Sequence, residues 1–424
     1  MIIKPKILLF VIFIYSYINL HSQFKYPNYF KYPFINQVEN HLKIYGTKSW
    51  TQFFKKLDSQ YLNGNEKINV MHFGGSHIQA DIWSNKMRTN FQNTITYNQS
   101  GRGFIFPFRL INSNGSSSVK SSHIGRWKGF RNSVNSHSGP FGLLGARAEL
   151  VDSFSVINVW NDHSLNSCES FNSLTVFYKD SSNSYDVNVL VDSGNAFSTS
   201  RQRESITFSF EKTIDSISIE VKKNKSTVSN FSFFGLLLDN DCKGITYHSI
   251  GVNGASVKSY LRGEDFTHQL ALIKPDLVIL SIGINDAYEE NFNEEYFYSS
   301  YDSLINKIRS VNPQVAILLT TNNDSYYKRE YPNQRALQVQ KKMYELAENK
   351  DLAVWDMFEV MGGLNSIRDW EKNNLAKKDL IHLTAKGYNL IGDLLFEALM
   401  KSYLKHKKKN NFQPIFLYLN LIPR

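Results

Sequence analysis

The chain has 424 residues, of which 42% are hydrophobic and 20% charged, so it is long enough for two domains of ordinary size with cores of their own. Its formal net charge of +10 is concentrated at the ends, because the leader holds two lysines and residues 401–424 hold six basic residues and no acidic one. The remaining body is near +2. Such a balance is ordinary for a solvated surface and argues against a nucleic-acid partner.

Residues 1–22 have the layout of a secretory signal peptide. Lys4 and Lys6 precede the apolar run "ILLFVIFIYSYINL", and the polar "HSQ" follows it. The run is short for a membrane span, so we predict cleavage near Ser22, with an uncleaved anchor as the alternative. An exported protein, periplasmic or associated with the cell envelope, is expected.

The cysteines and histidines form no metal-binding pattern. In an oxidising compartment the two cysteines, Cys168 and Cys242, either pair or stay apart, and their spacing alone does not decide which. His72 and His77 flank two glycines, but no third ligand is spaced to join them. No metal or other cofactor is therefore predicted.

The stretch "VMHFGGSHIQADIWS", Val70–Ser84, changes from a strand pattern to a helix pattern at two glycines and a serine. An apolar run precedes the glycines, and Ile78, Ile82 and Met87 recur afterwards at nearly helical spacing. Ser76 is therefore predicted at a helix N-terminus, where unsatisfied backbone amides favour developing negative charge. One interpretation is an ordinary turn with Ser76 as the N-cap. The other is a nucleophile whose own amide holds an oxyanion.

From Gly103 to Asp241 serine and asparagine become dense, and short alternating or apolar runs stand between the polar clusters. Five of these runs predict strands: "LTVFYKD", "YDVNVLVDS", "SITFSFEK", "DSISIEVKK" and "FSFFGLLLD". Several short strands separated by turn signals are typical of an antiparallel β-sandwich. The sandwich is placed at residues 105–241.

Strand and helix patterns alternate after residue 241. Continuous apolar runs of the kind found in buried parallel strands occur at Asp276–Gly283 and Gln314–Asn322, and "LAVWD" predicts a shorter strand. Helical patterns accompany them at residues 297–308, 334–349 and 385–404. The alternation predicts a doubly wound α/β structure.

The simplest arrangement is one α/β domain, at residues 23–104 and 242–404, that is interrupted by the sandwich. Its active crevice is expected at the carboxyl ends of the parallel strands, where Ser76 lies. The basic and apolar tail, residues 405–424, suits weak contact with an anionic membrane surface, and the alternative is a frayed, solvated terminus.

Three further stretches carry chemically useful residues. They are "SIGVNGAS" with Gly254, "SIGINDAY" with Asn285, and "KKDLIHLTAKGY" with Asp379 three residues before His382. Each alone has a structural interpretation, because Gly254 suits a turn and both Asn285 and Asp379 suit helix caps. Together with Ser76 they form an ordered set.

The order of these residues resembles the sequence blocks of the SGNH, or GDSL-like, hydrolases, named for serine, glycine, asparagine and histidine. The resemblance covers roughly residues 66–104 and 242–403. It implies a flavodoxin-like three-layer α/β/α domain with a parallel sheet, here interrupted by the antiparallel sandwich. It also implies an SGNH-type carboxylic ester hydrolase that uses no metal or cofactor.

The resemblance also implies roles for individual residues. Ser76 would be the nucleophile, His382 its general base, and Asp379 the group that holds the imidazole in the right tautomer. The amides of Ser76 and Gly254 and the side-chain amide of Asn285 would form the oxyanion hole.

One residue departs from the family pattern. The first block usually reads Gly-Asp-Ser, and Gly75 stands in place of an aspartate that ordinarily supports neighbouring loops. No proposed nucleophile, base or oxyanion donor is lost by this change. Asp81 and Asp286 are the candidates to compensate for it.

A sandwich inserted after the serine block resembles exported peptidoglycan or polysaccharide O-acetylesterases with a carbohydrate-binding-like domain. The predicted function is removal of O-acetyl groups from an O-acetylated cell-envelope or other polysaccharide through an acyl-enzyme. The alternatives are an O-acetyltransferase acting on glycan hydroxyls and a catalytically impaired glycan-binding protein. Some aromatic residues of the sandwich suit either stacking on sugar rings or burial in its core: Phe141, Trp160, Phe171 and Tyr178.

Overall fold

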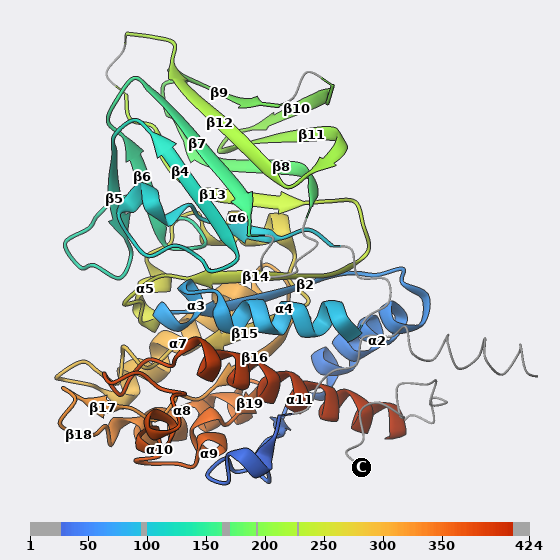
Figure 1. The fold of residues 1–424 in the computed structure, drawn as a ribbon, viewed down its shortest axis with the longest axis vertical. Helices are drawn as coiled ribbons and strands as arrows, with labels where there is room; N and C mark the ends of the chain where they lie inside the picture. The colour runs from blue at the N-terminus through green and yellow to red at the C-terminus, as the bar shows by residue number, and fades with distance from the viewer. Residues whose placement is uncertain (1–26, 95–99, 163–169, 192–193, 227–228, 410–424) are drawn as a thin grey trace, which may run out of the picture.

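The structure is a computed structural model, and Figure 1 shows its fold. It describes residues 27–94, 100–162, 170–191, 194–226 and 229–409. The predicted signal peptide, Cys168 and most of the predicted tail lie outside these ranges, so those expectations stay predictions. None of the helices in the described ranges has the length and hydropathy that crossing a membrane requires.

A six-stranded sheet forms the centre of the α/β part, in the order β1-β19-β16-β15-β2-β14. All neighbours pair in parallel except β1, which lies antiparallel to β19 at one edge. In chain order, the five parallel strands follow the 2-1-3-4-5 order of flavodoxin-like folds, which confirms the predicted fold class. The strands are β1 (Leu42–Ile44), β2 (Lys67–Gly74), β14 (Gly244–Gly251), β15 (Leu277–Ser281), β16 (Ala316–Thr320) and β19 (Ala353–Trp355).

The central strands are buried on both faces because successive side chains of a strand point to opposite sides. In β15, Leu277 and Ile279 enter one apolar cluster, while Val278 and Leu280 enter the other. The nearly continuous apolar runs of these strands are explained by this double burial.

Helices cover both faces of the sheet and make the outer layers of the three-layer structure (Figure 1). The cluster on one face includes residues from α2 (Thr47–Asn63), α3 (Ser76–Gln79), α4 (Ile82–Thr94), α9 (Met357–Met361), α10 (Ile367–Lys372) and α11 (Ala385–Lys409). The cluster on the other face includes residues from α5 (Val257–Leu261), α6 (Phe266–Ile273), α7 (Glu294–Arg309) and α8 (Arg335–Asn349). Short elements complete this part: η1 (Tyr29–Lys31) and the hairpin of β17 (Tyr326–Tyr327) and β18 (Tyr331–Pro332).

Helix α11 extends beyond the predicted end at residue 404, into the predicted tail. Lys407 is buried and forms an ion pair with Asp58 of α2. The start of the tail is therefore helical and packs against the domain through Lys407, rather than being frayed.

Two antiparallel sheets form the predicted sandwich, with the orders β10-β11-β8-β13-β6-β5 and β4-β7-β12-β9, and β3 also pairs with β13. Figure 1 shows them beyond the β14 edge of the parallel sheet. The elements are β3 (Gly103–Ile105), η2 (Phe108–Ile111), β4 (Val119–Ile124), β5 (Trp127–Arg131), β6 (Ala146–Leu150), β7 (Phe154–Asn161), β8 (Phe171–Lys179), β9 (Tyr185–Leu190), β10 (Phe197–Gln202), β11 (Ser205–Ile214), β12 (Ser216–Lys223) and β13 (Ser232–Asp239).

The sandwich and one face of the α/β sheet share a single apolar cluster. Phe104 and Phe233 of the sandwich belong to the same cluster as Phe73 of β2 and Phe266 of α6. The sandwich is therefore packed against the domain that it interrupts.

The four aromatic residues considered for sugar stacking have different environments. Phe141, Phe171 and Tyr178 are buried and belong to the core, whereas Trp160 is 40% exposed. Of these four, Trp160 alone is open to a ligand.

Candidate active site

The predicted site residues come from four separate segments that meet at the carboxyl ends of the parallel strands. Ser76 begins α3 directly after β2, Gly254 follows β14, and Asn285 follows β15. Asp379 and His382 lie in the loop before α11. The strand order of the sheet reverses between the neighbouring strands β2 and β15. In open α/β sheets, ligands bind at such a point.

A continuous hydrogen-bonded chain joins the three predicted catalytic side chains. Ser76 Oγ lies 2.8 Å from His382 Nε2, and His382 Nδ1 lies 2.9 Å from Asp379 Oδ2. With Nδ1–H donating to the carboxylate, Nε2 is left as the acceptor of the serine proton. The structure thus brings together the nucleophile, the base and the orienting acid that the sequence predicts.

Asp379 is held by its own loop as well as by the imidazole. Its Oδ1 accepts hydrogen bonds from the amides of His382 at 2.9 Å and Ile381 at 3.0 Å. Partial burial works against ionisation, but these hydrogen bonds and the His382 ring lower the pKa of Asp379 below its usual value. The carboxylate that accepts the hydrogen bond from His382 is therefore charged.

Each of the three predicted oxyanion donors has an N–H with no hydrogen-bond acceptor among the described residues. The amides of Ile78 and Gln79 both bond to Gly75 O, while the Ser76 amide has no acceptor among the described residues. The Gly254 amide likewise has no acceptor within that part of the chain. Asn285 Nδ2 donates one N–H to Ala255 O at 2.8 Å and keeps a second N–H, because a side-chain amide carries two.

His77 packs directly against the His382 imidazole, a contact that the sequence did not predict. Its ring stacks on that of His382, with centroids 5.1 Å apart and planes 21° apart, and its Nδ1 lies 2.9 Å from the Tyr388 hydroxyl. Burial, together with the neighbouring His382, lowers the pKa of His77 to about 3. The ring is therefore neutral at ordinary pH. In the sequence, only the position of His77 next to Ser76 indicated that it lies near the site.

Both ring nitrogens of His72 form hydrogen bonds to neighbouring strands of the parallel sheet. Its Nε2 lies 2.6 Å from Ser281 Oγ and its Nδ1 lies 2.8 Å from the Tyr247 hydroxyl. Burial lowers the pKa of His72 to about 3, so it stays neutral. Among the residues that the structure describes, no group of histidine, cysteine or acidic side chains is arranged to hold a metal ion.

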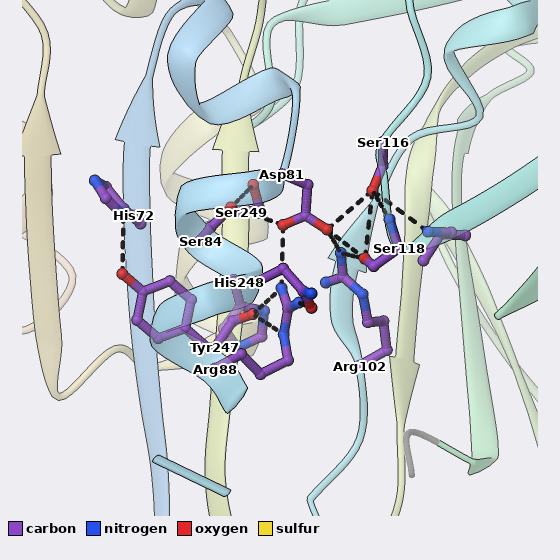
Figure 2. A network of polar contacts seen from close by, with 12 residues as sticks. His72, Asp81, Ser84, Arg88, Arg102, Ser116, Ser118, Tyr247, His248 and Ser249 are labelled. Carbon is purple, nitrogen blue, oxygen red and sulfur yellow. Dashed lines mark hydrogen bonds and ion pairs between the residues drawn. The ribbon is translucent and has the colours of Figure 1, made fainter. Parts of the chain in front are cut away.

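Asp81 lies at the centre of the buried polar network in Figure 2. Its carboxylate pairs with Arg102 at 2.5 Å and with Arg88 at 3.3 Å, and all three side chains are nearly inaccessible. Burial opposes the charge, but the two arginines and the hydroxyls of Ser118 and Ser84 hold the pKa of Asp81 well below its usual value. The network is therefore a buried cluster in which one carboxylate faces two guanidinium groups.

The same carboxylate attaches the start of the sandwich to the nucleophile segment. Asp81 Oδ2 accepts from Ser116 Oγ at 2.9 Å and from Ser118 Oγ (Figure 2). The Asp81 backbone carbonyl accepts from Ser117 Oγ at 3.0 Å. The Ser117 amide also donates to Ala80 O at 3.0 Å. Residues 116–118 are thereby bonded to the chain within five residues of Ser76.

Asp286, the second candidate to compensate for Gly75, holds a different loop. Both of its carboxylate oxygens lie 3.2 Å from the Val257 amide at the start of α5. Burial raises the pKa of Asp286 to about 7. This contact and the Asn285–Ala255 hydrogen bond tie the turn after β15 to the turn after β14.

The sequence match to a protein family covers the later part of the chain. Residues 215–390 match the GDSL-like lipase/acylhydrolase family. The matched segment contains Gly254, Asn285, Asp379 and His382 and begins after Ser76. No curated protein sequence matches the chain. Residues 215–390 are therefore similar to a GDSL-like lipase/acylhydrolase domain, which belongs to a family of esterases.

Solved structures extend the likeness to the whole fold. The chain is similar to a peptidoglycan O-acetylesterase, with 22% identity and a TM-score of 0.72 over 86% of this chain and 99% of the other. A GDSL-like lipase from Bacteroides thetaiotaomicron matches 36% of this chain and 74% of its own, with 20% identity and a TM-score of 0.29. A carbohydrate esterase family 3 protein from Talaromyces cellulolyticus matches 39% of this chain and 77% of its own, with 18% identity and a TM-score of 0.31. The first match spans the α/β part and the sandwich together.

Proposed function

We propose that this protein is an exported serine esterase that removes O-acetyl groups from a cell-envelope or other polysaccharide. The observation that carries the proposal is the hydrogen-bonded chain from Ser76 through His382 to Asp379 at the carboxyl ends of the parallel strands. The peptidoglycan O-acetylesterase of similar fold supports an acetylated glycan as the substrate class. The signal-peptide pattern of residues 1–22 supports export to the periplasm or cell envelope.

The first half of the reaction forms an acetyl-enzyme. Ser76 Oγ attacks the acetyl carbonyl carbon while His382 Nε2 takes its proton, and the charged Asp379 stabilises the imidazolium. The negative charge on the carbonyl oxygen is held by the amides of Ser76 and Gly254 and by Asn285. Collapse of the tetrahedral intermediate breaks the bond to the sugar oxygen, which leaves as a hydroxyl after taking the proton from His382.

The second half releases acetate. A water molecule attacks the acetyl carbon, His382 takes one of its protons, and collapse of the second intermediate returns that proton to Ser76 Oγ. Attack by a sugar hydroxyl in place of water would give acetyl transfer. The products therefore distinguish the two activities.

The sandwich is proposed to hold the glycan beside the α/β part. Its exposed Trp160 suits stacking on a sugar ring, because an aromatic face has large apolar area and few rotamers. The proposed division is a signal peptide at residues 1–22, an α/β domain at 23–104 and 242–404, and the sandwich at 105–241. The tail at 405–424 follows.

The test compares wild-type protein with Ser76→Ala on a chromogenic acetyl ester and on O-acetylated peptidoglycan. Wild-type protein is expected to release free acetate from both, and Ser76→Ala to release none, because the attacking oxygen is gone. The variant is expected to keep the wild-type melting temperature, since Ser76 makes only a small polar contact on a turn. Activity in a folded Ser76→Ala protein would show that the nucleophile is another residue.

Product analysis separates the competing activities. With labelled acetyl donor and unacetylated glycan present together, mass spectrometry should find most of the label as free acetate. A majority of the label in new sugar esters would indicate a transferase. Saturable glycan binding without turnover would indicate a binding protein that has lost its activity.

A further inference from the structure

The oxyanion donor of Gly254 lies in a turn that is held from two sides. The turn connects β14 to α5, and Gly254 adopts φ +80°, a conformation that residues with a Cβ rarely adopt. A glycine leaves its neighbouring peptide units free to rotate, so the direction of its N–H must be set by other contacts.

The first contact comes from the nucleophile helix. The Asn253 amide donates to Gln79 Oε1 at 2.6 Å, and Gln79 is itself buried. Gln79 Nε2 in turn donates to Ser113 Oγ at 3.0 Å and to Asn114 O at 2.8 Å. Both the oxygen and the nitrogen of the Gln79 side-chain amide are therefore hydrogen-bonded. Gln79 links helix α3 to the turn that contains Gly254.

The second contact comes from the sandwich. Ser133, in the loop between β5 and β6, donates its hydroxyl to Asn253 O at 2.7 Å. Ser133 also faces Gly254, because a Cβ added to that glycine would lie 3.6 Å from both Ser133 Cβ and Ser133 Oγ. The hydroxyl thus contacts the peptide unit that contains the predicted oxyanion donor.

The Ser133 loop is itself anchored to the α/β part. The Arg262 guanidinium donates to the backbone carbonyls of Asn132, Val134 and His137, and Asn132 Nδ2 donates to Ser259 O at 3.0 Å. Four hydrogen bonds therefore hold residues 132–137 in place around Ser133.

Peptide geometry connects the Ser133 contact to catalysis. The Asn253 carbonyl and the Gly254 N–H belong to one planar trans unit, so they point in opposite directions. When Ser133 holds the carbonyl on its side, the N–H is directed to the other side. Without that hydrogen bond, rotation of the unit would replace a donor by a carbonyl oxygen, which repels an oxyanion.

We propose that Ser133 and Gln79 are positioning residues that orient the Gly254 amide for the oxyanion, so that the sandwich completes the active site of the α/β domain. The inference rests on the proposed function, because it concerns the second oxyanion donor of that reaction. The inference goes beyond the proposed function, because it makes a loop of the sandwich necessary for hydrolysis of any acyl ester, including one with no sugar.

The experiment uses the full chain and a chromogenic acetyl ester with no sugar. Ser133→Ala should lower kcat by about tenfold to a hundredfold, less than the roughly hundredfold to thousandfold loss expected when an oxyanion donor is removed outright, while KM and the melting temperature stay close to wild type. Ser133→Thr keeps a hydroxyl and should recover most of the loss. Ser136→Ala removes an exposed serine from the same loop and is the matched control.

A double variant tests whether the two residues act through the same turn residue, Asn253. Gln79→Ala combined with Ser133→Ala should lose less than the product of the two single losses, because the second change then finds the donor already misdirected. Fully multiplicative losses would contradict a shared target. Wild-type kcat in Ser133→Ala, or an equal loss in Ser136→Ala, would overturn the inference.

The two proposals fail in different ways. No turnover by the wild-type protein would contradict the proposed function. Turnover by wild type together with unchanged turnover by Ser133→Ala would contradict the role of Ser133 alone.

Discussion

At Gly75 the missing side chain leaves room for the side-chain amide of Asn285, a predicted oxyanion donor. A Cβ built at this position would lie 2.9 Å from Asn285 Nδ2, which donates to Ala255 O at 2.8 Å. Any side chain at position 75 must therefore displace the Asn285 amide or the turn to which it is bonded. The glycine that departs from the family pattern is thus linked to the placement of Asn285.

Gly75→Ala is expected to lower kcat on the chromogenic ester by about tenfold or more, because a displaced amide binds the oxyanion less well. Steady-state kinetics and a melting curve measure the effect and check the fold. Gly115→Ala is the matched control, since a Cβ at Gly115 meets no atom within 4 Å. Equal kinetics for Gly75→Ala and Gly115→Ala would show that Asn285 is not constrained in this way.

His77 makes the folded state sensitive to acid. Its pKa falls from the ordinary value of 6.5 to about 3 in the folded protein, because burial and His382 disfavour the charged ring. The unfolded state therefore binds more protons between these two values, and the stability contributed by neutral His77 is lost as the pH falls below about 6.5.

His77→Gln should make the loss of stability between pH 7 and pH 5 smaller by about 2 kcal/mol, which is the linkage free energy of one such histidine. Urea denaturation at the two pH values measures the difference. The matched control variant is His268→Gln, which replaces an exposed histidine. If His77→Gln and wild type lose stability equally, the buried ring is not the acid-sensitive group.

At the scale of elements, buried charges attach the sandwich to the nucleophile segment. Asp81 follows α3 with φ +54°, pairs with Arg88 on α4 and with Arg102 just before β3, and bonds to residues 116–118. A buried pair whose partner is removed leaves an uncompensated charge, and that penalty exceeds the net gain from forming the pair. Asp81 is therefore essential to this junction even if the cluster as a whole adds little stability.

Asp81→Asn should lower the free energy of unfolding by about 3–5 kcal/mol, because two buried arginines lose a charged partner. Asparagine keeps the side-chain shape and tolerates the left-handed backbone, so the variant isolates the charge. Chemical denaturation measures the change. Asp152→Asn, at the exposed Arg126–Asp152 pair, should cost far less, and a similar cost for both variants would contradict the argument.

At the scale of the whole molecule, the site is assembled by sheet order and by the sandwich together. The strand order brings the turns after β14, β2 and β15 side by side, although the sandwich separates β2 from β14 in the chain. The shared apolar cluster then fixes the sandwich, with its Ser133 loop, against the α/β domain. Catalysis is thus expected to depend on both parts of the fold.

Because the proposed mechanism takes its nucleophile, base and oxyanion donors from the chain itself, a chelator such as EDTA should leave the rate of ester hydrolysis unchanged. Initial rates with and without EDTA give the answer. Strong inhibition that added Zn²⁺ or Mn²⁺ reverses would contradict the serine mechanism.

The sequence predicted the elements better than their contacts. The apolar runs of β15 and β16, the helical face of α7 and five sandwich strands follow from local periodicity, and the structure contains all of them. The family blocks named Ser76, Gly254, Asn285, Asp379 and His382, which the fold brings together, while their catalytic roles stay predictions. The roles proposed for His77, Gln79 and Ser133 had no such signal, since each depends on what lies opposite in space.

By itself the sequence determined where strands and helices form and which polar residues follow them, because hydrophobic period and turn chemistry act over a few neighbouring residues. Only the tertiary structure decided which of those residues meet. Gln79 contacts a residue 174 positions away, and Ser133 contacts the same residue across 120 positions. Contacts at that separation depend on strand order, register and the docking of the sandwich, which are set by packing of the whole chain rather than by any local pattern.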